Sequence, residues 1–162
     1  APINTPDILP SLLGLTEIEI PTTIEGENLS TLIKSPDPKK DRTALVMSVC
    51  PIAEEYIYQE YRAIRTKQYT YVRTPENTTM LFDNIEDPFQ MNNLIGNSDF
   101  EALHIELDDK LKKALQGIGD ENFQNRDYYL KKWNLKLSDR NHAIDYFGFE
   151  EDKGVVQTPR LN

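Results

Sequence analysis

The single cysteine, Cys50, could act as a nucleophile if His104 or His142 lay beside it. A thiolate paired with an imidazole is a competent nucleophile, as in thiol proteases. Cys50, however, closes an apolar segment with the composition of a strand, and His104 falls in a segment with helical periodicity. We therefore expect a buried, unreactive thiol and a histidine on the surface of a helix.

Metal and phosphate chemistry have no matching pattern in the sequence. Two histidines without a local spacing relationship do not predict a zinc site. The acids between Asp99 and Asp109 follow a helical face instead of a calcium loop. The seven glycines are scattered, so no glycine-rich phosphate loop is expected. We predict no metal site and no catalytic residue within this chain.

Anion binding is a chemistry for which the charge pattern offers one place in the chain. Between Glu60 and Glu76 the chain carries four cations and no acid, which predicts a stretch able to accept an anion. The alternative is that these cations pair with Asp83 or Asp87 at a strand edge. The four cations are Arg62, Arg65, Lys67 and Arg73.

The composition excludes several classes of protein. The chain has 162 residues with 27 acids and 18 lysines or arginines, and its net charge of −9 argues against a nucleic-acid binder. The longest apolar run, Ala44–Met47, is far shorter than the roughly 20 residues of a membrane helix, so we predict no membrane partner. Six Phe and eight Tyr favour one folded domain over disorder. One cysteine leaves the compartment open.

The elements that must position these residues begin with a short N-terminal helix. Thr5, Pro6 and Asp7 have the chemistry of a helix start, with a cap, a proline in the first turn and an acid near the positive end of the dipole. The helix should carry an apolar face and stop at Gly14, and residues 16–42 should wrap the surface with one helical turn near 29–33. The predicted apolar face consists of Ile8, Leu9, Leu12 and Leu13.

The middle of the chain has the pattern of an antiparallel meander. Four segments are rich in β-branched and aromatic residues, and short links join the last three. The predicted strands are Thr43–Cys50, Arg62–Thr66, Tyr69–Arg73 and Thr78–Asp83.

Helical signals follow the predicted strands. Asp87 and Gln90 form a capping box that predicts a short helix toward Leu94. A second box at Ser98 opens a long amphipathic helix that ends at Gly117 or Gly119. Beyond it, a helix through 128–133 should lead into a polar tail. The sequence therefore predicts an α+β fold: a sheet of about four strands with a long amphipathic helix on it, an N-terminal helix and a C-terminal helical tail.

Four motifs in the same order resemble the C-terminal end of type I sulfatases, which belong to the alkaline-phosphatase-like superfamily. The resemblance covers residues 5 to about 118. Asn28, Gln68 and Gln90 depart from the residues usual in that family. The motifs are T-P-D-I-L-P-S-L-L-G-L at 5–15, I-P at 20–21 with E-G-E-N-L-S-T-L-I at 25–33, Y-R-A-I-R-T-K-Q-Y-T-Y-V at 61–72, and L-F-D-N-I-E-D-P-F-Q-M-N-N-L at 81–94.

The resemblance implies an enzyme that hydrolyses sulfate esters and whose catalytic machinery lies in an N-terminal α/β domain. That machinery is a formylglycine made from Cys or Ser in a C/S-x-P-x-R motif, a calcium ion, and Lys and His side chains that hold the sulfate. Cys50 begins C-P-I-A-E, which lacks the spaced proline and the arginine, so Cys50 is not carried over as the nucleophile. The resemblance thus implies a C-terminal piece, inactive alone, with the N-terminal domain as partner and a sulfated sugar or small sulfate ester as substrate.

The resemblance also implies a division of the chain and a compartment. Residues 1–42 should belong to the edge of the catalytic domain, 43–118 to the C-terminal subdomain, and 119–162 to a C-terminal extension. The family favours a periplasmic or secreted enzyme. Two alternatives stay open: a subdomain of a phosphonate or phosphate ester hydrolase of the same superfamily, and a non-catalytic glycan-binding or interaction module with exposed tyrosines.

A substrate contact is predicted where the first strand is linked to the second. The link from Cys50 to Tyr61 is rich in Tyr and Glu, and loops at sheet ends often carry recognition groups. We expect Arg62 to approach a sulfated substrate, with Arg65 on the other face of the strand paired to an acid in 83–87. The alternative is that both arginines are internal braces. The predicted substrate-binding residues are Arg62, Tyr56, Tyr58 and Glu60.

Overall fold

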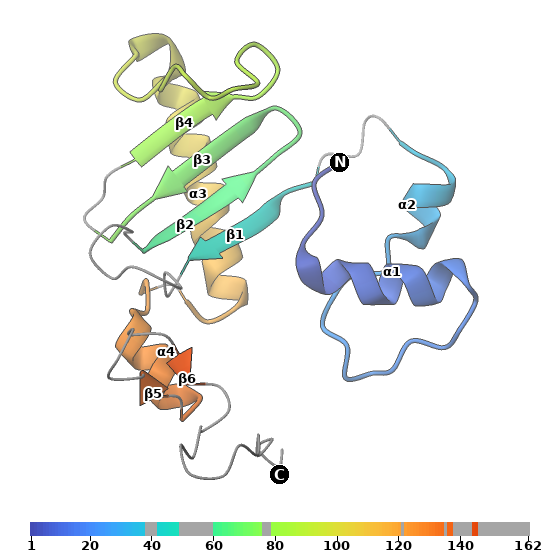
Figure 1. Cartoon of the computed structure of the whole chain (residues 1–162). Helices are drawn as coiled ribbons and strands as arrows, with labels where there is room; N and C mark the ends of the chain where they lie inside the picture. Colours follow the sequence, from blue (N-terminus) through green and yellow to red (C-terminus); the bar gives the residue numbers. More distant parts are fainter. Residues whose placement is uncertain are drawn as a thin grey trace.

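A four-stranded antiparallel sheet lies beside the N-terminal helices and above the C-terminal helix in the view of Figure 1. The computed structural model describes residues 1–37, 42–48, 60–75, 79–120, 122–134, 136–137 and 144–145. The strands pair in chain order, as expected for a meander with short links. This confirms the predicted α+β class. The strands are β1 (Ala44–Ser48), β2 (Tyr61–Arg65), β3 (Tyr69–Arg73) and β4 (Thr79–Asp83).

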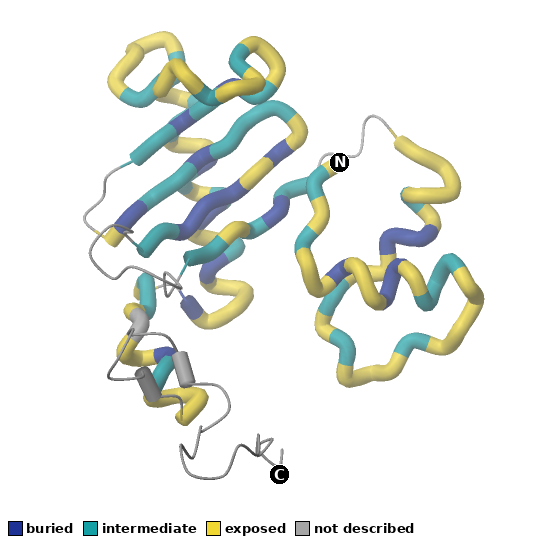
Figure 2. Tube along the Cα trace, in the orientation of Figure 1, coloured by how far each residue is buried: buried dark blue, intermediate teal, exposed yellow. Residues whose placement is uncertain are grey.

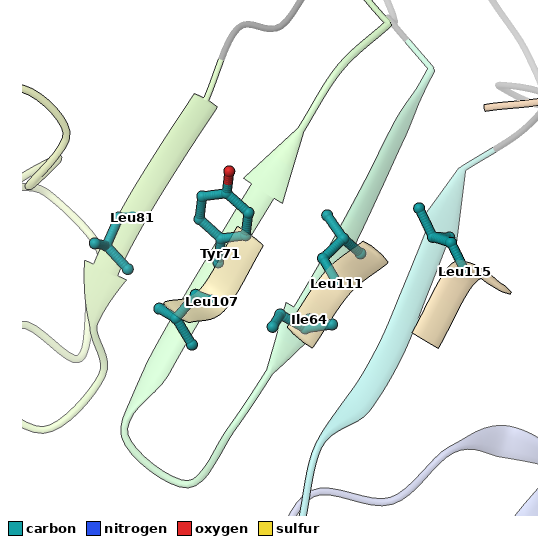
Figure 3. Packing of buried hydrophobic residues seen from close by; sticks show 6 residues of the cluster. All are labelled: Ile64, Tyr71, Leu81, Leu107, Leu111 and Leu115. Carbon is teal, nitrogen blue, oxygen red and sulfur yellow. The ribbon is translucent and has the colours of Figure 1, made fainter. Parts of the chain in front are cut away.

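One helix, α3 (Glu101–Gly117), covers one face of this sheet. The register places Tyr71 opposite both Ile64 and Leu81, so these side chains form a row across three strands. Leucines at every fourth position of α3 lie against that row, because residues four apart share one face of a helix (Figure 3). The buried core is Ile64, Tyr71, Leu81, Leu107, Leu111 and Leu115.

The start of this helix differs by one residue from the prediction. Asn97, not Ser98, caps it, since the Asn97 side chain accepts a hydrogen bond from the Asp99 backbone amide. A short 3₁₀ turn, η2 (Ser98–Phe100), then leads into α3. Asparagine caps a helix as well as serine does, and the two candidates are adjacent in the sequence.

The N-terminal segment forms η1 (Thr5–Asp7), α1 (Ile8–Leu15) and α2 (Ser30–Lys34). Asn4, not Thr5, is the N-cap, and Asp7 accepts from the Asn4 backbone amide. Gly14 does not stop α1: the left-handed residue is Glu17 with φ of 59°, and the Ile18 amide donates to the Leu13 carbonyl. Figure 2 shows exposed stretches along α1 and α2.

The helix predicted after Asp87 is absent. Residues 84–97 form turns, because the capping groups bond elsewhere. The Asp87 carboxylate accepts from the Asn92 amide, and the Gln90 side chain donates to Thr70 and Asn84. Gln90 itself has φ of 55°, which interrupts a right-handed helix.

The C-terminal part contains α4 (Arg126–Lys132), near the predicted helix, and Asn125 caps it by accepting from the Tyr128 amide. Two short strands, β5 (Lys136–Leu137) and β6 (Ile144–Asp145), pair antiparallel in the segment predicted as a polar tail. Figure 1 places α4 beyond the end of the sheet at which α3 ends.

Candidate functional site

Two arginines stand side by side on the face of the sheet that α3 covers. Arg62 of β2 is opposite Arg73 of β3 in the register. The guanidinium carbons of Arg62 and Arg73 lie 5.0 and 5.4 Å from the centre of the Phe123 ring. Each arginine has its own carboxylate partner, Asp120 for Arg62 and Asp108 for Arg73. Two like charges can be neighbours here because each is neutralised locally.

Arg62 is fully buried, with 0% of its surface exposed. Its Nε donates to Asp120 Oδ2 at 2.5 Å, and Nη2 donates to the Gln124 carbonyl at 2.7 Å. Nη1 donates to the Tyr61 and Ser48 carbonyls at 3.2 and 3.4 Å. All three guanidinium nitrogens are thus used within the protein, as burial of a charge requires.

The end of α3 aims Asp120 at this arginine. Gly119 has φ of 72°, and the amides of Gly119 and Asp120 donate to the carbonyls of Gln116 and Leu115. These two bonds define a Schellman motif, for which glycine is the residue best suited to the left-handed position. The Asp120 side chain also accepts from the Gln124 amide at 2.8 Å. The helix end therefore positions both the carboxylate and the start of the C-terminal extension.

The second arginine belongs to a more open cluster on α3. Asp108 accepts from Arg73 Nη1 and from the Tyr71 hydroxyl, both at 3.0 Å, and pairs with Lys112 at 2.7 Å. His104 Nε2 lies 3.3 Å from the Tyr71 hydroxyl oxygen. The predicted surface histidine is therefore half-buried against a core tyrosine. The cluster ties α3 to β3.

The charges of these clusters perturb the titration of three groups. Burial raises the pKa of the Asp108 carboxyl, but the hydrogen bonds from Lys112 and Tyr71 and the charge of Arg73 outweigh it, so its pKa is lowered. Burial and the hydrogen bond to Asp108 raise the pKa of Tyr71. Burial and the hydrogen bond to Asp120 raise the pKa of Tyr129 to about 12. Both tyrosines are neutral donors at neutral pH.

The predicted site residues have different positions. Tyr56 and Tyr58, like Cys50 and His142, lie outside the described residues. Glu60 is half-buried directly before β2. Arg62 lies in the buried cluster with its side chain inside the chain's own fold. These contacts favour the alternative in which Arg62 is a brace, and its role at a substrate stays a prediction.

The prediction for Arg65 is wrong. Arg65 is exposed and donates to the Thr70 hydroxyl, and no ion pair joins it to residues 83–87 within the described part of the chain. Asp83 instead accepts from the Gln68 side chain and from the amides of Ile85 and Glu86, which close the turn after β4. Those bonds outweigh the effect of burial and lower the pKa of Asp83.

A second polar centre fixes the N-terminal segment. Asp7 is 4% exposed and accepts from the amides of Asn4 and Glu27, each at 2.9 Å, and from Arg42 at 3.0 Å. Burial raises the pKa of Asp7, but these donors outweigh it and lower the pKa. Gly26 is required beside it, because a Cβ there would lie 1.9 Å from the Pro6 carbonyl oxygen. Arg42 also pairs with Glu27 and donates to the Pro2 carbonyl, and so joins distant parts of this segment.

A groove of about 1010 Å³ separates this segment from the sheet and the end of α3. The lining contains both acids and lysines, so the groove favours neither anions nor cations. Among the described residues, no three His, Cys, Asp or Glu side chains gather as a metal site would require. No described helix is both long and apolar enough to cross a membrane. The groove lining includes Asn4, Asp7, Glu25, Met47, Lys110 and Lys113.

A family described as N-sulphoglucosamine sulphohydrolase, C-terminal, matches residues 3–117. The chain belongs to this family. It is 60% identical over 159 residues to an ulvan-active sulfatase of Formosa agariphila, a match that covers 98% of this chain and 31% of that protein. It is 30% identical over 116 residues to an endo-4-O-sulfatase of Bacteroides thetaiotaomicron, covering 57% of this chain and 21% of that protein. The resemblance to the C-terminal part of sulfatases is confirmed.

Solved structures share the fold. A structure determined with its substrate D-glucosamine-2-N,6-O-disulfate matches with a TM-score of 0.57 at 20% identity, over 70% of this chain and 24% of that one. A 2-O GAG sulfatase matches with a TM-score of 0.57 at 23% identity, over 72% of this chain and 25% of that one. The chain thus spans about a third or less of the length of these relatives.

The residue that sequence reasoning missed is Asp120. It lies 58 positions from Arg62, in a stretch read only as the end of a helix. The glycines at its helix end were a signal for the turn, but no local pattern pairs an acid after a helix with an arginine in a distant strand.

Proposed function

We propose that this chain is the C-terminal part of an enzyme that hydrolyses sulfate esters of a sulfated polysaccharide. The observation that carries the proposal is the 60% identity to the ulvan-active sulfatase over 98% of the chain. Because the chain spans 31% of that protein, we assign the nucleophile, the formylglycine and the calcium ion to an N-terminal domain outside this sequence.

We further propose that residues 1–42 dock against that domain. Three of the four apolar side chains predicted to share a face of α1 are about half exposed: Ile8, Leu9 and Leu12 at 47%, 54% and 55%. Burying what remains exposed would contribute about 1 kcal/mol for each, or about 3 kcal/mol in total. The Asp7–Arg42 ion pair fixes the start of α1, and the apolar face of the helix points away from this ion pair.

In this proposal, residues 43–118 form the C-terminal subdomain, which braces the catalytic domain, and residues 119–162 form an extension. Arg62 acts as an internal brace that joins the subdomain to the extension. Tyr56, Tyr58 and Glu60 remain the proposed rim of the substrate site. Glu60 directly precedes β2, and loops at sheet ends often carry recognition groups.

Sulfate esters are proposed over phosphonate or phosphate esters because both curated relatives are sulfatases by name. The test is the full-length protein, matured to carry formylglycine, assayed for release of sulfate from ulvan and from an aryl sulfate. An aryl phosphonate serves as the competing substrate. We expect hydrolysis of the sulfates to exceed hydrolysis of the phosphonate. A preference for the phosphonate would overturn the proposal.

The matched control is this chain alone, with and without calcium. We expect no turnover, because the nucleophile and the anion-binding residues are assigned to the other domain. Turnover by this chain that disappears in Cys50→Ala would contradict that assignment.

A further inference from the structure

Helix α4 and the residue after it carry exposed aromatic rings and lysines close together in the chain. Trp133, directly after the helix, is 54% exposed, and Tyr128 is 39% exposed. Residues four apart share a helix face, so Tyr128 lies with Lys132 and Tyr129 lies with Trp133. The Tyr128 and Tyr129 rings touch edge to face with their centres 5.2 Å apart, which joins the two rows. We call Tyr128, Lys131, Lys132 and Trp133 the α4 face.

Contacts with buried residues hold the α4 face in place. The Tyr129 ring, 9% exposed, lies 4.8 Å from the Trp133 ring at an angle of 34°. The Tyr129 hydroxyl hydrogen-bonds to Asp120, which also pairs with the buried Arg62. A continuous set of contacts therefore runs from β2 to the exposed indole. A large exposed ring held in this way pays little ordering entropy when a flat ligand stacks on it.

The charge of the α4 face is opposite to that of the chain as a whole. Residues 126–136 contain four cations and one acid in the sequence, whereas the whole chain has a net charge of −9. Lys131 and Lys132 are both exposed. The Lys132 ammonium lies 5.6 Å from the centre of the Tyr128 ring, which holds it at the surface beside the aromatic rings. Asp127 lies four positions before Lys131, a spacing at which opposite charges on a helix attract, so we expect Lys132 to be the stronger anion contact.

The position of α4 in the chain separates it from the shared family domain. The family match ends at residue 117, before α4 begins. The match to the ulvan-active sulfatase covers 159 of the 162 residues, so it must include α4. The helix is thus shared with a relative whose name records a polysaccharide, but lies outside the region that defines the family.

We propose that the α4 face binds a strand of sulfated polysaccharide, with Trp133 stacked on a sugar ring and Lys132 paired with a sulfate group. The proposal rests on the proposed function, since it takes the polymer to be the substrate. Exposed aromatic rings suit the apolar faces of sugars, and exposed lysines beside them suit sulfate. Charge complementarity selects an anionic polymer over a neutral glycan.

The test is gel retardation of the full-length protein in ulvan, in chemically desulfated ulvan and in a neutral glucan. The variants are Trp133→Ala, Trp133→Phe and Lys132→Gln. Lys112→Gln is the matched control, because it removes the same charge from an exposed lysine that pairs with acids of its own helix, Asp108 and Asp109. Melting temperatures and turnover of an aryl sulfate are measured on the same preparations.

We expect Trp133→Ala to weaken binding to ulvan by about three- to tenfold and Trp133→Phe to restore most of it. Lys132→Gln should weaken binding by about two- to fivefold at low salt, with the difference shrinking at high salt. Turnover of the aryl sulfate should be the same in every variant as in the parent enzyme. A parent enzyme that shows no turnover would contradict the proposed function and not the binding proposed for the α4 face.

Three results would overturn the proposal. One is equal retardation of Lys132→Gln and the parent protein at low salt. Another is equal retardation in ulvan and in its desulfated form. The third is a lowered melting temperature for Trp133→Ala with unchanged binding, which would assign the α4 face to packing against another part of the protein.

Discussion

Replacing Arg62 by methionine should destabilise the protein strongly and leave catalysis nearly unchanged. Arg62 and Asp120 are both 0% exposed, so the substitution leaves a carboxylate buried without its cation. Removing one partner of a buried ion pair costs about 3–5 kcal/mol of the free energy of unfolding. The carbonyls of Tyr61 and Gln124 also lose a donor, which places the expected cost toward the upper end of that range.

Two further variants separate charge from geometry. Arg62→Lys keeps the positive charge but has no planar fork, so it can pair with Asp120 and not with all the carbonyls around it. We expect it to lose about 1–3 kcal/mol. The double variant Arg62→Met with Asp120→Leu removes both charges, and its loss should be clearly smaller than the sum of the two single losses.

The assay is chemical denaturation of the full-length protein followed by circular dichroism, with kcat and KM for an aryl sulfate measured on the same samples. A large loss of stability with unchanged kinetics identifies Arg62 as a brace. Unchanged stability together with a raised KM would refute this reasoning and support the contact with a sulfated substrate predicted from the sequence.

Four other outcomes follow from the structure. Leu111→Ala in the core should cost about 2–5 kcal/mol by denaturation, and a loss below 1 kcal/mol would contradict the packing of α3 on the sheet. The pKa of Tyr129 is raised in the fold to about 12, so its contribution to stability is present below the unfolded value near 10 and is lost as pH rises toward 12. When melting temperature is measured against pH, Tyr129→Phe should reduce this loss of stability at alkaline pH. Because the pKa of Asp7 is lowered in the fold, its contribution to stability is present above the unfolded pKa near 4 and is lost at lower pH. Asp7→Asn should therefore lower the stability of the protein at pH 7 more than at pH 3. Leu9→Asp with Leu12→Asp on α1 should weaken association of this chain with a separately produced catalytic domain in a pull-down, and undiminished capture would count against docking through that face.

The sheet and its helix could be predicted from the sequence because their signals are local. Tyr69–Arg73 alternates aromatic and β-branched residues, and α3 repeats leucine at every fourth position over several turns. Short links leave adjacent strands little choice but to pair with one another. The family could likewise be inferred from motifs that are contiguous in the chain.

The helix predicted at 88–94 failed because its local signal had competitors. Asp87 and Gln90 have the spacing of a capping box, but their side chains find partners at Asn92, Thr70 and Asn84. Helix capping contributes about 1 kcal/mol, so a few hydrogen bonds in a folded loop are enough to override it. The stop expected at Gly14 lies at Glu17 instead, and Gly14 meets a different requirement: an added Cβ there would lie 2.4 Å from the Asn28 side chain.

By itself, the sequence determined the meander, the amphipathic helix on it and the membership of a sulfatase family, because the signal for each of these comes from residues that are close together in the chain. Only the tertiary structure decided which face of the sheet Arg62 shares with Asp120, and that the two meet at all across 58 positions. The charge pattern alone does not distinguish an arginine that is available to bind an anion from one that is already paired with a carboxylate. That distinction depends on where α3 ends in space, and it is the packing of leucines on the sheet that sets this end.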